Sequence, residues 1–519
     1  SHCRPRLEGL EPRELLSLTP AGPEFRINTV TTLSQQSPAV ASDASGDFVV
    51  VWQSGDISSG YDIKAQRYNP SGVAQGSEIT VNSSVTNSNQ FRFNPSVAMD
   101  SAGDFVVSWE YYDVNAVNTS DYDIFARRFD AAGTALSNEF RVNATTGGTQ
   151  QDSSVAMDST GNFVVTWRDS AGATPVISFQ RYNASGTAQG GEIDVDVTST
   201  TTQTLPSIAM DTGGNYAIAF AALNGSLSDS DGGIYFRRYN ASGVAQGSLT
   251  RANTTTTGLQ TSPAIGMASD GAFVVSWSGN GTQSGQTDSQ GVFFQRYDAT
   301  GVAQSTETRA NTTTANGQLV PAIAMNPLTA ALGTFTIVWT DDATDGGGRG
   351  VYGQNFTTTG ALAGTQFQAN TTIAGDQTSP AIATGGNGGT LITWQSPQGG
   401  TTDIWAQRYT TNLAPTANNQ SVAVNANTPK PITLMGSDPE SAPLTFTVIV
   451  NPTNGSLSGT APNLTYTPNM GYTGPDSFQF KVNDGTQDSL TPGTVSITVS
   501  AAVVLQSITV TPANPSVPK

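Results

Sequence analysis

The stretch GDFVVVW at residues 46–52 constrains this chain more than any other feature, because six related stretches follow it. They are GDFVVSW (103–109), GNFVVTW (161–167), GNYAIAF (214–220), GAFVVSW (271–277), GTFTIVW (333–339) and GGTLITW (388–394). Successive residues of a strand point to opposite faces of its sheet, and from the third residue of the stretch onward nearly all are apolar. This is the pattern of a strand whose sheet is packed on both faces. A repeat of about 57 residues therefore predicts a series of sheets stacked against one another.

Other elements recur around each copy in a fixed order. In the first unit, SPAVASD (37–43) precedes the stretch, and a strand ending in AQRY (65–68) follows it. A Gly-containing turn, NPSGVAQG (69–76), then leads to EITVN (78–82). Four strands per unit is the pattern of a β-propeller blade, so seven units predict a seven-bladed β-propeller. Trp52 and its equivalents are expected to fill the seams between blades as core residues.

The seventh unit lacks a fourth strand of its own, because the chain leaves it after Tyr409 as TTNLAPT. The segment EFRIN, Glu24–Asn28, stands before the first unit with no partner there. We therefore expect Glu24–Asn28 to pair with Ile404–Tyr409 and to close the ring. Such closure removes the open sheet edge that would otherwise promote aggregation.

Composition excludes several classes of function. The formal net charge of -18 and the scarcity of lysine argue against a nucleic-acid partner, and they fit an extracellular or cell-surface location. The single cysteine, Cys3, excludes a disulfide framework. The single histidine, His2, lies in the N-terminal tail and leaves the folded body without a histidine triad or zinc site. No apolar run of about 18 residues exists, so the chain is not expected to span a membrane.

Two polar positions recur with the repeat and are predicted to be structural. SDASGDFVVVW resembles the Asp-box turn of sialidase-type propellers, and this resemblance implies a turn-forming role for Asp43, Asp100, Asp158 and Asp211. An arginine recurs on the third strand of six units, and Asn355 replaces it in the sixth. These arginines are Arg67, Arg128, Arg181, Arg238, Arg296 and Arg408. Six copies at one strand position predict a repeated hydrogen bond or ion pair.

The segments between the second and third strands vary in length and sequence, whereas the other turns are nearly uniform. Variable loops on a rigid scaffold are where binding usually resides, so one face of the propeller is the candidate ligand face. The candidate ligand-binding residues are Tyr61, Asp62, Tyr111, Tyr112, Asp113, Asp121, Asp123, Asp341, Asp342 and Asp345. Solvated acidic loops without a ligand are the alternative interpretation.

The C-terminal part contains PITLMGSDPESAPLTFTV (431–448) and LTYTPNMGYTGPDSFQFKVNDG (464–485). These stretches resemble the bacterial cadherin-like, Ig-type β-sandwich. The resemblance implies a spacer module of secreted surface proteins, with calcium as a cofactor in some relatives. Asp438, Glu440 and Asp484 would be the metal ligands, since hard cations prefer several oxygen ligands. Turn capping is the alternative role of these residues.

The N-terminal segment RPRLEGLEPRELLSL (4–18) resembles the LEPR-x-LL segment near the start of large surface proteins of planctomycete-type bacteria, which implies export. The expected fold is all-β, a seven-bladed β-propeller followed by an Ig-like β-sandwich. The expected domains are an export-associated tail (1–22), the propeller (23–412), the sandwich (413–501), and a linker that begins a further Ig-like domain (502–519).

The leading functional prediction is a non-enzymatic extracellular adhesion or recognition protein whose variable face binds a carbohydrate or a surface protein. The near-identity of the blades supports it, because catalysis needs one asymmetric group of residues. One alternative is a carbohydrate-active hydrolase or lyase that uses carboxylates and needs no histidine. The other alternative is a purely structural component of the cell envelope.

Overall fold

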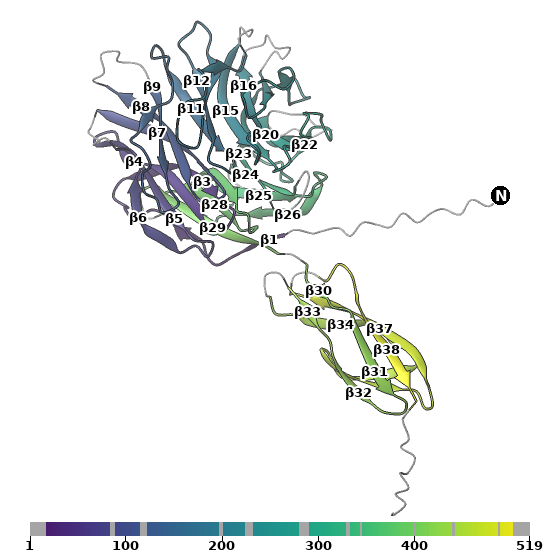
Figure 1. Cartoon of the computed structure of the whole chain (residues 1–519). Coiled ribbons are helices and arrows are strands. Elements are labelled where there is room, and N and C mark those ends of the chain that lie inside the picture. The colour runs from purple at the N-terminus through teal and green to yellow at the C-terminus, as the bar shows by residue number, and fades with distance from the viewer. Residues whose placement is uncertain are drawn as a thin grey trace, which may run out of the picture. The chain divides into compact units, whose positions relative to one another are not determined.

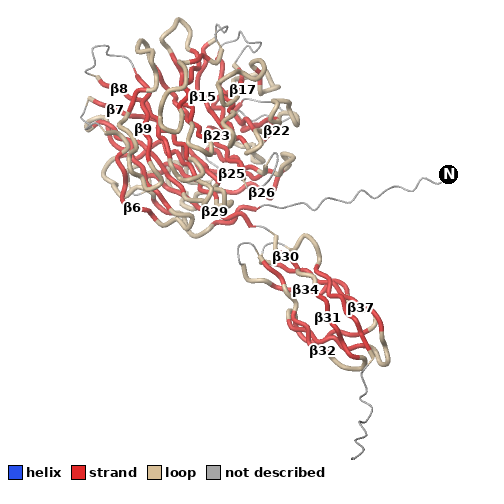
Figure 2. Tube along the Cα trace, viewed as in Figure 1, coloured by secondary structure: helices blue, strands red, loops and turns tan. Residues whose placement is uncertain are grey.

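A computed structural model of the chain describes residues 17–83, 89–114, 122–196, 201–223, 232–279, 290–327, 333–342, 345–398, 400–412, 414–438, 442–485 and 488–501. The regular elements of these residues are all strands, and Figure 2 shows strands and loops without a helix. The chain divides into two compact units, one formed by Leu15–Thr411 and one that contains Asn412–Lys519.

The first unit contains seven separate sheets, which we number as blades 1 to 7. Blade 1 comprises β3 (Ser34–Ser42), β4 (Phe48–Asp56), β5 (Gly60–Tyr68) and β6 (Ala74–Thr80). Blade 2 comprises β7 (Gln90–Met99), β8 (Phe105–Asp113), β9 (Tyr122–Phe129) and β10 (Phe140–Arg141). Blade 3 comprises β11 (Gln150–Met157), β12 (Phe163–Asp169), β13 (Val176–Tyr182) and β14 (Ile193–Asp194).

The other blades repeat this antiparallel order. Blade 4 comprises β15 (Thr202–Met210), β16 (Tyr216–Leu223), β17 (Gly233–Tyr239) and β18 (Thr250–Arg251). Blade 5 comprises β19 (Gln260–Met267), β20 (Phe273–Gly279), β21 (Gly291–Tyr297) and β22 (Thr308–Arg309). Blade 6 comprises β23 (Gln318–Met325), β24 (Phe335–Asp341), β25 (Gly350–Phe356) and β26 (Leu362–Gln368). Blade 7 comprises β27 (Thr378–Thr384), β28 (Thr390–Ser396), β29 (Asp403–Asn412), β1 (Ser17–Pro20) and β2 (Phe25–Arg26).

The blades form a closed ring. The first strand of each blade packs against the first strand of the next, and β27 of blade 7 packs against β3 of blade 1. Figure 1 shows this closure, with the purple β3 beside the green β28. The first unit is therefore the β-propeller that the repeat predicted.

The N-terminal segment completes blade 7, as predicted. Phe25 and Arg26 of β2 pair with Ala406 and Trp405 of β29, and the N–H of Ile27 donates to the carbonyl of Ile404 at 2.8 Å. The propeller also begins earlier than the sequence suggested. Residues 1–22 were assigned to a tail, whereas β1 at Ser17–Pro20 pairs with the long strand β29, which offers a free edge there.

The aromatic residue that ends each copy of the repeated stretch is a core residue, as predicted. These side chains are at most 1% exposed, and they are Trp52, Trp109, Trp167, Phe220, Trp277, Trp339 and Trp394. Two of the indoles hydrogen bond to a buried glutamine of their own blade. Trp52 Nε1 donates to Gln35 Oε1 at 2.7 Å, and Trp277 Nε1 donates to Gln260 Oε1 at 3.0 Å.

A buried asparagine after the fourth strand links each of several blades to the next. Asn311, after blade 5, accepts the backbone N–H of Val292 at 2.9 Å and donates to Gln318 of blade 6 at 2.9 Å. Asn28 makes the corresponding contact for blade 7, since it accepts the N–H of Ile404 at 2.8 Å. The N-terminal segment therefore supplies blade 7 with both its fourth strand and this asparagine.

The recurring arginines join neighbouring blades by hydrogen bonds to a turn of the next blade, which confirms their predicted structural role. We call this interaction the clasp. Arg67 of blade 1 donates to the carbonyl of Ala132 in the outer turn of blade 2 at 2.6 Å. Arg238 donates to the carbonyl of Ala299 at 2.6 Å in the same way. Arg408 of blade 7 donates to the carbonyl of Ser71 in blade 1 and so joins the last blade to the first.

The recurring aspartates form turns, as the Asp-box resemblance implied. Asp100 Oδ1 accepts the backbone N–H groups of Ala102 at 2.9 Å and Asp104 at 3.0 Å. Asp43, Asp158 and Asp211 accept backbone N–H groups at the same two spacings. Each carboxylate therefore stabilises the turn of its own hairpin. These hairpins lie on the face of the propeller opposite to the variable loops, which we call the uniform face.

The second unit is an Ig-like sandwich. One sheet has the order β31 (Gln420–Asn425), β38 (Gly493–Ser500), β37 (Gly474–Asn483), β34 (Thr445–Val450), and the other has the order β32 (Lys430–Thr433), β36 (Asn463–Pro468), β35 (Gly455–Thr460). Strands β30 (Thr416–Ala417) and β33 (Gly436–Ser437) form a small pair. The core includes Phe478, Phe480 and Tyr466, whose hydroxyl donates to Asp476 Oδ2 at 2.7 Å.

The clasp at the closing seam can be tested with two glycines that share a φ of 78°. A Cβ at Gly72 would lie 2.6 Å from Cδ of Arg408, whereas a Cβ at Gly76 would meet no atom within 4 Å. Both substitutions to alanine carry the left-handed backbone cost of about 1–2 kcal/mol. We expect Gly72→Ala to destabilise the propeller by about 1 kcal/mol more than Gly76→Ala, because it displaces Arg408 from Ser71. Urea unfolding measures this difference, and equal effects would contradict the clasp.

Candidate functional site

A channel of about 370 Å³ runs between the first strands of the blades, and all seven blades line it. Each first strand contributes a bulge there, at a residue with φ between 47° and 57°. These residues are Ser37, Asn94, Asp152, Leu205, Ser262, Val320 and Ser379. Six of the next residues are prolines, so the channel wall is rigid and repeats around the ring. Strained backbone at such positions is a feature that often accompanies functional sites.

In several blades, the residue that follows the tryptophan of the repeated stretch accepts a hydrogen bond from the backbone N–H of the bulge residue in the next blade. Gln395 accepts the N–H of Ser37 at 2.9 Å, Gln53 accepts the N–H of Asn94 at 3.1 Å, and Ser278 accepts the N–H of Val320 at 3.0 Å. In blade 2 this residue is Glu110, whose Oε1 accepts the N–H of Asp152 at 2.8 Å. A carboxyl group therefore occupies a position that neutral side chains fill in these other blades.

Glu110 and Asp152 form a carboxyl pair that the rest of the ring does not repeat. The positions equivalent to Glu110 hold Gln53, Arg168, Ala221, Ser278, Thr340 and Gln395. Asp152 is the only acidic residue among the seven bulge residues of the channel. The pair makes one sector of a nearly symmetric channel chemically distinct.

The two carboxyl groups of this pair lie in different environments. Glu110 is 2% exposed, and burial raises its pKa although Asn94 donates to it at 3.1 Å. The side chain of Asp152 is 25% exposed, lines the channel and lies 3.8 Å from Nε of Arg168. Thr204 also donates to Asp152 at 3.3 Å. Glu110 is therefore a buried carboxyl group with a raised pKa, and Asp152 is a partly exposed carboxyl group beside the guanidinium of Arg168.

The sequence analysis did not predict this pair, because both residues lie on strands and not in the variable loops. The signal was present in the repeat itself. Aligning the seven units shows Glu110 where two other blades have glutamine, and Asp152 where three have serine. A departure from the repeat inside a strand is therefore a stronger indication of a site than variation in a loop.

Beside the pair lies a group of five partly exposed aromatic side chains, which we call the aromatic platform. Its members are Tyr61, Phe91, Phe93, Tyr112 and Tyr122. The rings of Phe91 and Phe93 stack at 5.9 Å between centroids, and those of Tyr112 and Tyr122 stack at 4.8 Å. Tyr61 of blade 1 contacts Phe93 of blade 2 at 5.4 Å. Sequence analysis named Tyr61 and Tyr112 and missed the other three.

Two other predicted residues lie next to the platform. The hydroxyl of Tyr111 donates to Asp113 Oδ2 at 3.3 Å, and Arg92 lies over the Tyr111 ring at 5.2 Å. Burial raises the pKa of Tyr111 to about 12. Arg92 itself is fully buried, so this cation lies beneath the surface and not on it.

Asp62 and Asp123 belong to the repeated scaffold. Asn82 donates to Asp62 at 2.8 Å and Asn143 donates to Asp123 at 2.6 Å, as Asn28 does to Asp403 at 2.6 Å. The same asparagine-to-aspartate hydrogen bond occurs in three blades, so it gives these carboxylates a structural role. Ligand binding by Asp62 and Asp123 stays a prediction. Asp121 lies outside the described residues.

The three candidates from blade 6 lie apart from those of blades 1 and 2, since blade 7 intervenes in the ring. Asp341 is fully buried and accepts from Gln318 at 3.3 Å. Asp342 pairs with Arg349 at 2.7 Å, and Asp345 accepts the N–H groups of Gly347 at 2.9 Å and Gly348 at 3.1 Å. These contacts give each carboxylate a structural partner, and ligand binding by them stays a prediction.

The metal ligands predicted for the sandwich also stay a prediction. Asp438 accepts the N–H of Ala442 at 2.8 Å, which is a turn-capping contact, and Asp484 is 8% exposed. Glu440 lies outside the described residues. Within the described part of the chain, no three acidic, histidine or cysteine side chains are grouped to hold a metal ion.

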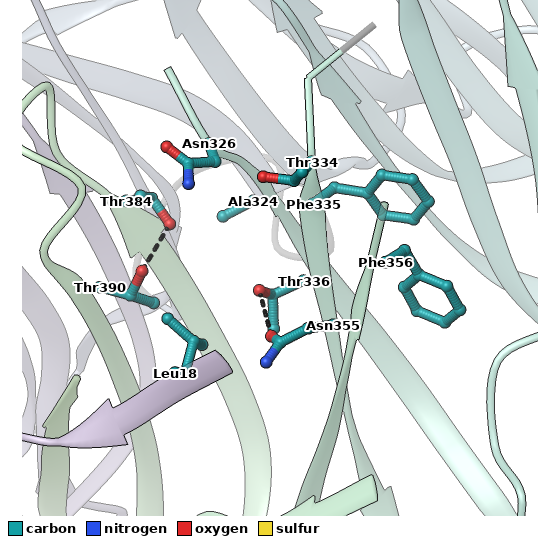
Figure 3. A pocket seen from close by; sticks show the side chains of 10 residues that line it. All are labelled: Leu18, Ala324, Asn326, Thr334, Phe335, Thr336, Asn355, Phe356, Thr384 and Thr390. Carbon is teal, nitrogen blue, oxygen red and sulfur yellow. Dashed lines mark hydrogen bonds between the residues drawn. The ribbon is translucent and has the colours of Figure 1, made fainter. Parts of the chain in front are cut away.

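A small cavity on blades 6 and 7 has a structural explanation (Figure 3). Leu18 of β1 lines it together with Phe335, Phe356 and Asn355, the residue that replaces the recurring arginine. Blade 7 has the N-terminal strands in place of an outer hairpin, so an arginine at 355 would lack the usual turn to clasp. Asn355 instead accepts from Thr336 at 2.8 Å. With a volume of about 20 Å³ the cavity has room for one water molecule and not for a substrate.

The pKa of Asp341 generates a prediction about stability. Burial raises this pKa to about 6, and the charges of Asp342 and Asp345 add to the shift. A raised native pKa means that Asp341 contributes most to stability below about pH 4 and that this contribution is lost as the pH rises through 6. Asp341→Asn should therefore stabilise the propeller by about 2–3 kcal/mol at pH 8 and leave stability nearly unchanged at pH 4.

Urea unfolding at the two pH values measures this effect. Asp342→Asn is the comparison variant, since it removes a carboxylate that is paired with Arg349 and relieves only the smaller, coulombic part of the shift of Asp341, so any gain at pH 8 should be well below that of Asp341→Asn. A gain for Asp341→Asn that is equal at both pH values would show that the buried charge is not its cause.

Comparison with known proteins identifies one domain. Residues 412–498 match the family described as bacterial Ig domain, in agreement with the Ig-like sandwich predicted there. No curated protein matches the chain. In the described part of the chain, no helix is both long and apolar enough to cross a membrane.

Solved structures similar to this chain include three carbohydrate-active proteins. The polysaccharide lyase Uly1 has 10% identity and a TM-score of 0.46, covering 79% of this chain and 94% of its own. The α-L-arabinofuranosidase of Fusarium graminearum has 10% identity and a TM-score of 0.43, covering 61% and 92%. The α-L-arabinanase of Penicillium chrysogenum has 13% identity and a TM-score of 0.40, covering 74% and 98%.

These comparisons correct the leading functional prediction. The sequence analysis favoured a non-enzymatic adhesion or recognition protein, whereas the similar structures are hydrolases and a lyase, which match its alternative instead. The prediction that the chain is not an enzyme is corrected with it. At these identities the likeness concerns the fold alone, so an activity has to be argued from the residues of this chain.

Proposed function

We propose that this protein is a carbohydrate-active enzyme that hydrolyses glycosidic bonds of a polysaccharide bound at the variable face of the propeller. The observation that carries the proposal is the carboxyl pair of Glu110 and Asp152, which occurs in one sector of the ring, with Asp152 lining the channel and Glu110 bonded to the channel-lining Asn94. This pair is an asymmetric group of residues of the kind that catalysis needs.

The pair has the properties that glycoside hydrolysis requires. Hydrolases of this type use one carboxylic acid to protonate the leaving oxygen and one carboxylate to attack the sugar or activate water. Burial raises the pKa of Glu110, which favours the acid role for this residue. Asp152 borders the channel next to Arg168 and would be the carboxylate.

Asn94 connects the pair to the channel. It lines the channel and donates to the same Glu110 oxygen that accepts the N–H of Asp152. A sugar in the channel would compete with Asn94 for the Glu110 carboxyl group. Catalytic hydrogen bonds often reach their final geometry only once the substrate is bound.

Hydrolysis is favoured over elimination by the tyrosines near the site. A lyase needs a base that removes a carbon-bound proton, and without a histidine in the folded body a tyrosinate is the obvious choice. The pKa values of Tyr61 and Tyr122 are raised by burial, and that of Tyr111 is raised to about 12. These phenols therefore stay protonated at neutral pH and make poor bases.

An extracellular location is part of the proposal. The bacterial Ig domain at 412–498 and the net charge of -18 support it. A polymeric carbohydrate outside the cell would be a substrate that such a protein can reach.

The proposal is tested by Glu110→Gln. Glutamine holds the next bulge at the equivalent position in blades 1 and 7, so the variant should keep the fold and its melting temperature. Loss of a general acid should lower the rate of sugar release by about 10²–10⁴-fold. The assay is reducing-sugar release from arabinan, xylan, mixed-linkage glucan and polygalacturonate by the full chain.

Gln395→Glu is the matched control, because it places a carboxyl group at the equivalent position of blade 7, where the next bulge residue is Ser37 and not Asp152. It should leave the rate near that of the wild type. Equal rates for wild type and Glu110→Gln, with both folded, would refute the assigned role. No release from any of the four polymers by the wild type would count against hydrolysis of these classes.

A further inference from the structure

We infer that the aromatic platform (Tyr61, Phe91, Phe93, Tyr112 and Tyr122) is a subsite that stacks the pyranose rings of an uncharged polysaccharide. The inference deepens the proposed function, since it names the substrate class of the same site. It also stands on its own as a statement about binding.

The platform is built by unusually long strands. Strands β4, β5 and β8 have nine residues and β7 has ten, whereas β20 and β21 of blade 5 have seven. Tyr61, Phe91 and Tyr112 occupy the added ends at the variable face. In blade 4 the strands β15 and β16 reach the equivalent positions, and these hold Thr202 and Leu223 in place of Phe91 and Tyr112.

Exposure distinguishes the platform from the aromatic packing of the scaffold. Stacked pairs recur near the uniform face of the blades, for example Phe105 with Phe129 and Phe163 with Tyr182, and these side chains are at most 6% exposed. Each platform ring is partly exposed, and among the residues that the structure describes the group occurs in one sector only. Core packing explains the buried pairs and does not explain five partly exposed rings.

Partly exposed, stacked rings are suited to sugars. The face of an aromatic ring is electron-rich and attracts the C–H groups on the apolar face of a pyranose. Binding sites of this kind combine aromatic area with a few polar groups that fix orientation. Asn94, which follows Phe93 and donates to Glu110 at 3.1 Å, offers such a polar group beside the platform.

The charge around the platform selects an uncharged polymer. Asp56 and Asp113 lie on the same strand ends, Asp62 is paired there with Lys64 at 3.5 Å, and the whole chain carries a net charge of -18. Arg92, the nearest arginine in the sequence to these rings, is fully buried and engaged with the Tyr111 ring. Carboxylates at a rim repel uronate and sulfate groups but accept hydrogen bonds from neutral hydroxyls.

The platform is continuous with the carboxyl pair. Phe93 is the direct cross-strand partner of Glu110, and Asn94, which donates to Glu110, is the next residue. A chain of sugars stacked on Phe91 and Phe93 would therefore extend toward Asn94 and the channel. This adjacency makes the platform a subsite of the proposed active site.

The test measures binding separately from turnover. The full chain, as wild type and as Glu110→Gln, is run in native gels containing xylan, galactomannan, mixed-linkage glucan or polygalacturonate. The double variant Tyr112→Ala/Tyr122→Ala is compared with Tyr352→Ala, which removes an equally half-buried tyrosine from blade 6. We expect retardation by at least one neutral polymer, a loss of roughly tenfold or more in affinity for the double variant, and no change for Tyr352→Ala.

Each other outcome has a defined meaning. Equal retardation of the double variant and the wild type would overturn the platform as a subsite, whatever sugar release shows. Retardation by polygalacturonate alone would overturn the uncharged substrate class, and absence of retardation in all four gels would overturn the inference. Retardation that depends on the platform without sugar release would leave the subsite in place and refute the hydrolysis proposed above.

Discussion

The propeller depends on one constraint, which is that a strand apolar on both faces can be buried only between two other sheets. Strand β4 illustrates it. Val49 and Val51 pack with Phe105 and Trp109 of blade 2, whereas Val50 and Trp52 pack with Leu391 and Ile404 of blade 7. Every blade needs two neighbours, so a linear stack would leave an apolar face at each end. Closure of the ring is the only arrangement that buries them all.

Closure also explains features that look like exceptions. The N-terminal segment has to complete blade 7, so it carries both the strand pairing of Phe25 and the asparagine contact of Asn28. That segment replaces the outer hairpin of blade 7. A side chain at position 355 therefore has no turn in the next blade to donate to, and Asn355 stands where the other blades have the recurring arginine. The cavity beside Leu18 follows from the same cause. One topological requirement therefore accounts for several local departures from the repeat.

The fold was largely predictable because its determinants repeat. Seven copies of a two-sided apolar strand predict the blades, and the unpartnered EFRIN segment predicts the closing strand. The extra strand at Ser17–Pro20 was not predictable, since SLTP has no apolar alternation and gains its partner only from the free edge of β29. The site escaped prediction for a related reason. Phe91, Phe93 and Glu110 look like ordinary strand residues until the register places them side by side.

Departures from a repeat have to be divided into those that the scaffold requires and those that it does not. Asn355 belongs to the first kind, and Glu110 belongs to the second. Glutamine holds the next bulge in blades 1 and 7 without a charge, so the structural task at this position does not need a carboxyl group. Burial raises the pKa of Glu110, which means that the ionised form is unfavourable where it stands. The position of Glu110 therefore calls for an explanation other than the bulge contact, and the acid role proposed for it is one that a buried carboxyl group with a raised pKa fits.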